Sequence, residues 1–201
     1  IDGSFFIAME YLEGQSLNKI VREAWRAKKP LSHQETVRIV SDALAGLSYA
    51  HELRDYSGTP LKVIHRDVSP HNLFVTYDGN VKLMDFGIAR VMNDPSLTQA
   101  HQTTGSLYYM SPEQINGAQL DGRSDLYSLA ISLYEMLTRR RPFDGENTYA
   151  IMAAHMHTAP VPPMQIDARI PKALNDVVLM GMAKDAGARF QTAGAFRAAL
   201  G

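Results

Sequence analysis

The 201-residue sequence contains no cysteine. This absence excludes disulfides and cysteine-ligated zinc, and it fits a reducing compartment, so we expect the segment to lie in the cytoplasm. The sequence also lacks an excess of charge of either sign, because its 20 Lys and Arg residues are nearly balanced by 21 Asp and Glu residues. A net charge of −1 argues against a nucleic-acid binder driven by phosphate contacts. The densest basic cluster, residues 139–141, is typical of a solvated helix end.

Long hydrophobic runs are missing as well. The longest apolar stretch, residues 126–137, includes Ser, Tyr and Glu and is too short to span a bilayer. No signal peptide is visible. We therefore expect no membrane contact from this segment, and an anchor of the full-length protein would lie outside it. The chain opens at Ile1 without a Met and stops at Gly201 just after a helical pattern, which we interpret as a piece of a longer protein.

The pattern that is present is mostly helical, with one strand and one hairpin. Residues 5–9 are typical of a buried strand and 10–14 of a turn. Ser32 and Glu35 form a capping-box signature at the start of a long helix. Residues 91–110 are expected to form a long functional loop, and 160–163 a surface linker. Helices are predicted over 16–28, 32 to about 53, 122–138 (buried on nearly every side), 148–157, 171–183 and 190–200.

The most informative stretch is residues 65–72, HRDVSPHN, followed by Asp85-Phe86-Gly87. Between them, two short apolar runs, 73–76 and 81–84, flank an Asp-Gly pair, which is a strong hairpin signal. Because a hairpin folds back, we expect it to bring Asn72 and Asp85 together, with Asp67 facing them. Three converging oxygen-bearing side chains suit Mg²⁺ and a phosphoryl group.

These motifs, in register with Ser111-Pro112-Glu113, resemble the C-terminal lobe of a bacterial eukaryotic-like (Hanks-type) serine/threonine protein kinase. The resemblance covers nearly the whole chain. It implies an α+β, mostly α-helical, protein-kinase-like fold, with a large C-lobe, a hinge strand and a short β-hairpin, and with the N-lobe missing. Residues 1–201 would then be a partial kinase domain, in which 1–14 form the last N-lobe strand and the hinge, and 15–201 form the C-lobe.

The resemblance implies a role for each motif residue in phosphoryl transfer. Asp67 would accept or orient the proton of the substrate hydroxyl, while Asn72 and Asp85 would hold Mg²⁺ on the ATP phosphates. Ser69 stands where serine/threonine kinases usually carry a Lys, so transition-state stabilisation should weaken unless another cation substitutes. Ser106 matches the family position that faces the substrate hydroxyl.

The resemblance also assigns an adenine-binding hinge. Met9 would be the gatekeeper, the backbone of Glu10 and Leu12 would bond the adenine edge, and Phe74 would form the floor under the ring. The alternative for this segment is a plain strand and turn. The family's Gly-rich loop, its strand Lys and the Glu partner of that Lys do not occur in these 201 residues. We therefore expect this polypeptide alone to bind ATP poorly and to phosphorylate little.

Other motif residues have structural roles by the same resemblance. His65 and Phe86 would pack in a hydrophobic stack. Asp125 would accept backbone N–H groups of the catalytic loop, with a simple helix N-cap as the alternative. Glu113 and Arg189 would form an ion pair.

Arg66 is typical of a kinase that is switched by activation-loop phosphorylation, since an Arg can pair with the phosphate. The candidate acceptors are Thr98, Thr103 and Thr104, with ordinary polar loop residues as the alternative. The resemblance implies protein substrates, and a dimer would allow phosphorylation in trans.

Two other functions remain open. A pseudokinase scaffold or allosteric module would keep the fold without transfer, which Ser69 and the missing lobe favour and intact Asp67, Asn72 and Asp85 oppose. A small-molecule phosphotransferase shares a similar catalytic loop, but it normally lacks a DFG motif followed by a long loop and a Pro-Glu pair.

Overall fold

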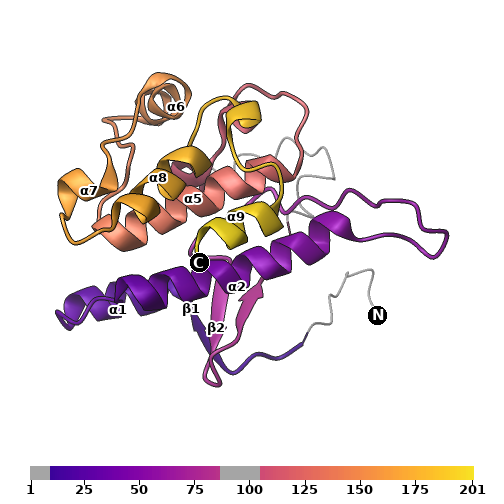
Figure 1. The fold of residues 1–201 in the computed structure, drawn as a ribbon, viewed down its shortest axis with the longest axis horizontal. Helices are drawn as coiled ribbons and strands as arrows, with labels where there is room; N and C mark the ends of the chain where they lie inside the picture. The colour runs from indigo at the N-terminus through magenta and orange to yellow at the C-terminus, as the bar shows by residue number, and fades with distance from the viewer. Residues whose placement is uncertain (1–9, 87–104) are drawn as a thin grey trace, which may run out of the picture.

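The computed structural model describes residues 10–86 and 105–201. Figure 1 shows a helical body with a small antiparallel sheet along one edge. This architecture confirms the expected mostly helical α+β fold. The elements in chain order are β1 (Gly14–Ser16), α1 (Leu17–Arg26), α2 (His33–Glu52), β2 (Leu73–Thr76), β3 (Val81–Leu83), the 3₁₀ helix η2 (Ser106–Tyr109), α4 (Pro112–Ile115), α5 (Gly122–Thr138), α6 (Thr148–His157), α7 (Pro163–Ile166), α8 (Lys172–Gly181), η3 (Ala186–Ala188) and α9 (Ala193–Ala199).

Helix α5 is the centre of the core, and it packs against α2, α8 and α9. Nearly all of its side chains are buried, as the sequence predicts. Its buried hydroxyl groups need partners, and three of them find a partner one turn back along the helix. Ser128, Ser132 and Thr138 each donate to the carbonyl four residues earlier, at 3.1, 3.0 and 2.8 Å. A polar-containing helix can therefore be buried without unpaired hydroxyls.

Helix α2 lies across α5 and α9 and begins with the predicted capping box. Glu35 N donates to Ser32 Oγ at 3.1 Å, and Ser32 N donates to the Glu35 carboxylate at 2.7 Å. The reciprocal pair satisfies two N–H groups that a helix start leaves open. Val40, Leu44 and Leu47 are buried and fix the apolar face against the core.

The sheet has the order β1-β2-β3 with both pairs antiparallel. The hairpin of β2 and β3 confirms the prediction from the Asp-Gly pair, but β1 lies where a turn and a helix start are predicted. Gly14 makes this pairing possible, because a Cβ there would lie 2.2 Å from Val75 O. The close approach to β2 is a tertiary contact that local sequence does not encode.

Some predicted boundaries are wrong near the C-terminal end. The linker predicted at 160–163 is one residue too long, because Pro163 is the first residue of helix α7, which was not predicted, and Pro171 is the N-cap of α8, one position before its first helical residue. Helix α9 begins at Ala193, because Thr192 Oγ1 accepts from Ala195 N at 3.0 Å and caps it. Phe190 lies before the helix and stacks on Phe196, with ring centres 4.6 Å apart.

Among the helices of residues 10–86 and 105–201, none combines the length and the apolar character needed to cross a bilayer.

Candidate active site

The carboxylate of Asp67 is bonded directly to Asn72. Asn72 Nδ2 donates to Asp67 Oδ2 and to Asp67 O, both at 2.8 Å. The amide nitrogen of Asn72 therefore serves Asp67, and the amide oxygen, an atom type that Mg²⁺ prefers, lies on the other branch of the side chain. Two of the three oxygen-bearing residues expected from the sequence thus meet in the structure.

The hairpin brings Met84, the residue before Asp85, into contact with Asn72. Met84 N donates to Asn72 O at 2.8 Å, and Leu73 lies opposite Leu83, so Asp85 follows at the open end of the hairpin. Asp85 has a φ of 55°, which is left-handed backbone that side chains seldom adopt and that tends to occur at functional sites.

The donor set in this region is a carboxylate and an amide rather than a cage of charged ligands. Within residues 10–86 and 105–201, no group of three or more His, Asp or Glu side chains is arranged to hold a metal ion. That set fits Mg²⁺, which is usually bound through one or two carboxylates, with waters and substrate phosphates completing its shell.

The catalytic-loop backbone is held by Asp125, in the first turn of α5. His65 N donates to Asp125 Oδ2 at 2.9 Å and Arg66 N donates to Oδ1 at 2.8 Å. Asp125 is only 1% exposed, and a buried carboxylate is costly unless it is hydrogen-bonded. These two backbone N–H groups provide the hydrogen bonds. The contacts are those that the resemblance implies, and the alternative of an N-cap is wrong because Asp121 caps α5.

His51 is a third partner of Asp125 that the sequence analysis missed. Its Nε2 lies 2.8 Å from Asp125 Oδ2. The residue occurs in the last turn of α2, where a His is also typical of a helix end, so its sequence gives little signal. Gly122 leaves space for the ring, because a Cβ at that position would lie 2.7 Å from His51 Nδ1.

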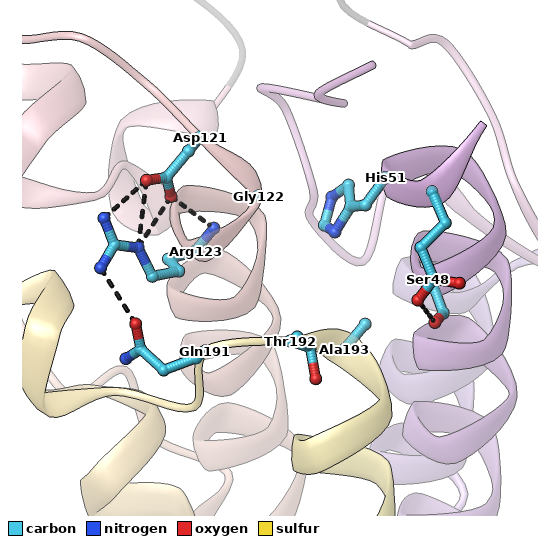
Figure 2. Close-up of a pocket in the computed structure, with 9 residues that line it drawn as sticks. Ser48, His51, Asp121, Gly122, Arg123, Gln191, Thr192 and Ala193 are labelled. Atoms are coloured by element: carbon cyan, nitrogen blue, oxygen red, sulfur yellow. Dashed lines mark hydrogen bonds and ion pairs between the residues drawn. The ribbon is translucent and has the colours of Figure 1, made fainter. Parts of the chain in front are cut away.

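Behind His51 lies a cavity of about 350 Å³ between the end of α2 and the starts of α5 and α9 (Figure 2). Its polar groups mainly pair with one another. Arg123 donates to both carboxylate oxygens of Asp121 and to Gln191 Oε1 at 3.1 Å, and Ser48 Oγ donates to Glu52 at 3.0 Å. Of these pairs only Arg123–Gln191 joins two elements, the start of α5 and the segment before α9, and none of them contacts the catalytic loop.

His65 is completely buried and bonded at both ring nitrogens. Its Nδ1 accepts from Asp67 N at 3.3 Å, and its Nε2 lies 2.9 Å from Met84 O. This pattern is satisfied by the neutral tautomer with hydrogen on Nε2. The ring also packs on Phe86, with centres 4.4 Å apart. His65 therefore links the catalytic loop to the residues before and within the DFG motif, as packing residues would.

Ser69 is 1% exposed, and its carbonyl accepts from Asn72 N at 3.0 Å. The position is thus enclosed, in contrast to the partly exposed Asp67. Of the expected hinge, Glu10 and Leu12 precede β1, and Glu10 lies 3.5 Å from Lys82 Nζ. Phe74 is a half-buried residue of β2. The predictions for Met9, Thr98, Thr103 and Thr104 fall outside the described residues.

Arg66 and Ser106 border Asp67. Arg66 has a φ of 68°, and its carbonyl accepts from Gln114 Nε2 at 2.7 Å. Arg66, Asp67, Ser106 and Gln114 line the same small cavity of about 10 Å³. The structure therefore places Ser106 next to Asp67 at the lining of this cavity.

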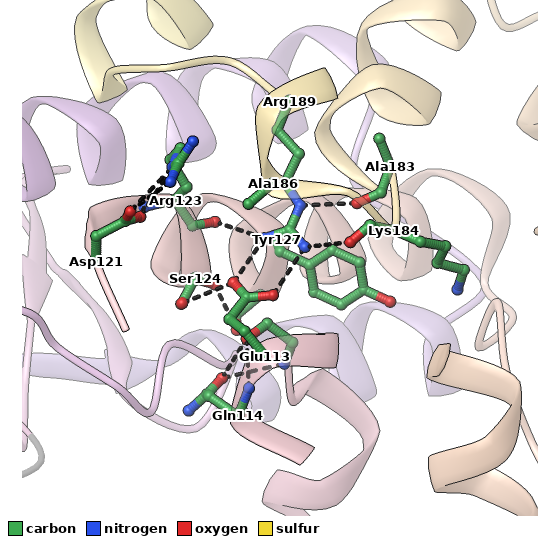
Figure 3. A network of polar contacts seen from close by, with 12 residues as sticks. Glu113, Gln114, Asp121, Arg123, Ser124, Tyr127, Ala183, Lys184, Ala186 and Arg189 are labelled. Atoms are coloured by element: carbon green, nitrogen blue, oxygen red, sulfur yellow. Dashed lines mark hydrogen bonds and ion pairs between the residues drawn. The ribbon is translucent and has the colours of Figure 1, made fainter. Parts of the chain in front are cut away.

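Glu113 and Arg189 form the expected ion pair (Figure 3). Arg189 Nη1 and Nη2 donate to the two carboxylate oxygens of Glu113 at 2.7 and 2.9 Å. The other three N–H groups of Arg189 donate to carbonyl oxygens of Ala183, Arg123 and Lys184. An arginine has five such donors, so this buried one is fully satisfied.

Burial and nearby charges shift the pKa values of three side chains in and around this ion pair. Burial alone would raise the pKa of Glu113, but hydrogen bonds from Arg189 and Ser124 outweigh it and lower the pKa. Burial, with the nearby charge of Arg189, lowers the pKa of Lys184 to about 8. Burial also lowers the pKa of His155 to about 4, and its Nδ1 lies 3.0 Å from the Tyr127 hydroxyl.

The fold and this arrangement of residues are those of the large lobe of a protein kinase. The family model described as the protein kinase domain matches residues 2–195, and the chain belongs to this family.

Similar proteins are found among bacterial kinases. The tyrosine-protein kinase MasK of Myxococcus xanthus is 39% identical over 99% of this chain and 31% of its own length. The serine/threonine-protein kinase pkn3 of Myxococcus xanthus is 40% identical over 99% of the chain and 36% of its own length. PknB of Mycolicibacterium smegmatis, also a serine/threonine-protein kinase, is 39% identical over 97% of the chain and 30% of its own length. The chain thus spans about a third of the length of these curated relatives.

Proposed function

We propose that the protein containing this chain transfers the γ-phosphoryl group of ATP to serine or threonine hydroxyls of proteins. The observation that carries the proposal is the way in which hydrogen bonds hold Asp67 in place. Its carboxylate is fixed by Asn72, and the backbone that precedes it is fixed by Asp125. Positioning of this kind is the main contribution that a protein makes to phosphoryl transfer.

Each residue has one task in this proposal. When bound, ATP supplies the phosphoryl group and Mg²⁺ neutralises its charge. Asp67 accepts or orients the proton of the acceptor hydroxyl, which Ser106 helps to place. The Asn72 amide oxygen and the Asp85 carboxylate are the oxygen ligands that this chain offers to the cation. Glu10 and Leu12 offer backbone groups to the adenine edge, Phe74 forms the floor under the ring, and Met9 acts as the gatekeeper.

The proposal places this activity in the cytoplasm and in a longer protein. The 201 residues alone lack the Gly-rich loop and strand Lys that hold ATP in this family, so the segment alone should be a poor kinase. Copies of the full-length protein would phosphorylate one another in a dimer at Thr98, Thr103 or Thr104, and Arg66 would pair with the added phosphate.

The test is phosphate transfer from labelled ATP with Mg²⁺ by the full-length protein and its Asp67→Asn variant. Asparagine can keep the hydrogen bond from Asn72 but cannot take up the proton. Label that appears with the wild type, vanishes in the variant and lies on Ser or Thr supports the proposal. Label on Tyr would contradict the serine/threonine preference, which is a real alternative because MasK is named a tyrosine-protein kinase.

A pseudokinase is the second candidate, and Ser69 favours it. This position usually provides a positive charge at the transferred phosphoryl group, and Ser provides none. If both proteins are folded and neither becomes labelled, the result would support a scaffold or allosteric module instead of an enzyme.

A further inference from the structure

Gln114 lies on α4 next to Glu113 (Figure 3), and both ends of its side-chain amide are engaged. Its Oε1 accepts from Ser111 N at 3.0 Å and from Ser111 Oγ at 3.1 Å, which completes a capping box. Its Nε2 donates to Arg66 O at 2.7 Å, across 48 positions of sequence. The capping box therefore fixes the rotamer with which Gln114 reaches the catalytic loop.

The acceptor belongs to the peptide that immediately precedes Asp67. The left-handed φ of Arg66 is a conformation that persists where the surroundings hold it in place. The N–H of Arg66 is held by Asp125, and its carbonyl is held by Gln114. The N–H at the other end of this peptide, on Asp67, donates to His65 Nδ1. Side chains thus hold the peptide from both ends.

Solvent cannot readily replace Gln114 as the donor. The cavity that Gln114 lines with Asp67 and Ser106 has a volume of about 10 Å³, which is at or below the size that one water needs. If the side-chain donor were lost, the Arg66 carbonyl would have to turn to find another partner. The orientation of the peptide, and with it the position of Asp67, would then change.

We propose that Gln114 is a positioning residue for phosphoryl transfer, which fixes the Arg66–Asp67 peptide and so aims the Asp67 carboxylate at the acceptor hydroxyl. This inference rests on the proposed function. It makes α4 and the catalytic loop a single unit, so that a displacement of α4 is transmitted to Asp67. Misplacing a reacting group by about 1 Å can cost roughly 100-fold in rate.

The test is the Gln114→Glu variant of the full-length protein. Glutamate suits this position of a capping box as well as glutamine does, but it sets a carboxylate oxygen against Arg66 O in place of the donor. We expect kcat at pH 8 to fall by about tenfold or more, with little change in KM for ATP. The carboxylate opposite the Arg66 carbonyl should have a pKa above the ordinary Glu value of about 4.3, and the protonated acid donates again, so the ratio of wild-type to variant kcat should shrink as the pH is lowered from 8 towards about 5.

Gln191→Glu is the matched control. Gln191 also donates through Nε2 to backbone carbonyls, including Arg189 O at 2.6 Å, but it lies in the segment before α9. Its kcat should stay within about twofold of the wild type at every pH, because no contact with the catalytic loop is lost. Circular dichroism and Tm verify that both variants fold.

Two results separate the two ideas. An active wild type with a Gln114→Glu variant of equal kcat and equal pH profile overturns the positioning role. A wild type without transfer overturns the proposed function, and amide hydrogen exchange then decides on Gln114. Faster exchange of residues 65–67 in Gln114→Glu than in Gln191→Glu and the wild type supports the positioning role, whereas equal exchange overturns it.

Discussion

Breaking the Glu113–Arg189 ion pair should destabilise the protein far more than breaking an ion pair on its surface. The side chain of Arg189 is 0% exposed and that of Glu113 is 16% exposed. Without the Glu113 carboxylate, the guanidinium charge would stay in the interior with only peptide carbonyls as partners. Its guanidinium carbon also lies 4.8 Å from the centre of the Tyr127 ring, so it cannot turn out to solvent without unpacking the core.

The expected magnitude follows from what each variant leaves behind. Glu113→Gln leaves an uncompensated buried charge, which should lower the free energy of unfolding by about 3–5 kcal/mol. Arg189→Met leaves three carbonyl oxygens without their donor, at about 1–3 kcal/mol for each one that stays buried and unpaired. The double variant should cost less than the sum of the two, because either change alone already breaks the pair.

The assay is urea-induced unfolding followed by circular dichroism, with Glu23→Gln as the control. Glu23 lies 3.1 Å from Arg26, and both side chains are largely exposed, so this change should cost under about 1 kcal/mol. Equal losses for Glu113→Gln and Glu23→Gln would refute the reasoning.

The pH dependence gives a second signature of the same pair. The pKa of Glu113 is lowered from 4.5 in the folded protein. The stabilisation by the ion pair is therefore complete above about pH 4.5 and is lost as the pH falls through the folded pKa. The difference in stability between the wild type and Glu113→Gln should accordingly shrink below pH 4.5.

Two further predictions concern buried titratable groups. Because the pKa of His155 is lowered to about 4, against 6.5 for an ordinary histidine, the unfolded chain takes up a proton first, and this group alone should lower wild-type stability by about 3 kcal/mol between pH 7 and pH 4. His155→Gln can still bond the Tyr127 hydroxyl without titrating, so its urea midpoints should fall less over this range, and an identical fall would contradict the assignment. Asp125→Asn has one acceptor oxygen for three donors, so it should leave a buried catalytic-loop N–H unpaired, lose about 1–3 kcal/mol of stability and lower kcat in the full-length protein. An unchanged kcat in steady-state assays would contradict that role.

Elements with strong local signals were predictable from the sequence. Helices α5 and α6 have the expected bounds, and α2 begins at the expected capping box, because the apolar content and the N-cap residue of each helix lie within or next to its own segment. Strand β1 was not predictable, since three residues show no alternation and pairing with β2 alone defines them. Helix α7 was missed for a related reason, because it directly follows a Pro-rich stretch at 160–163 that is typical of a linker, and its Met164 N donates to Asn175 of a later helix.

In the candidate site too, the residues that belong to a local motif were predictable and those that act on distant partners were not. Asp67, Asn72 and Asp85 were found because their motif is contiguous apart from one hairpin. The resemblance supplied the partners of Asp125 and the Glu113–Arg189 pair. His51 and Gln114 were missed, since each acts on a partner far away in the sequence and carries no motif of its own. The roles of the hinge residues and of the threonines in the long loop stay predictions.

The catalytic loop has to hold its shape without help from regular secondary structure. Helices and strands pair their own backbone groups, whereas in this loop side chains pair them: Asp125 bonds two N–H groups, His65 a third, and Gln114 and Asn72 bond carbonyls. Each partner can bond only if its own element is in place, and these partners come from α4, α5 and the loop itself, with α2 supporting Asp125 through His51. Asp67 is therefore positioned by α2, α4 and α5, the elements that pack on the loop, and changes to their contacts with the loop should alter the reaction by moving a peptide plane rather than by touching a substrate.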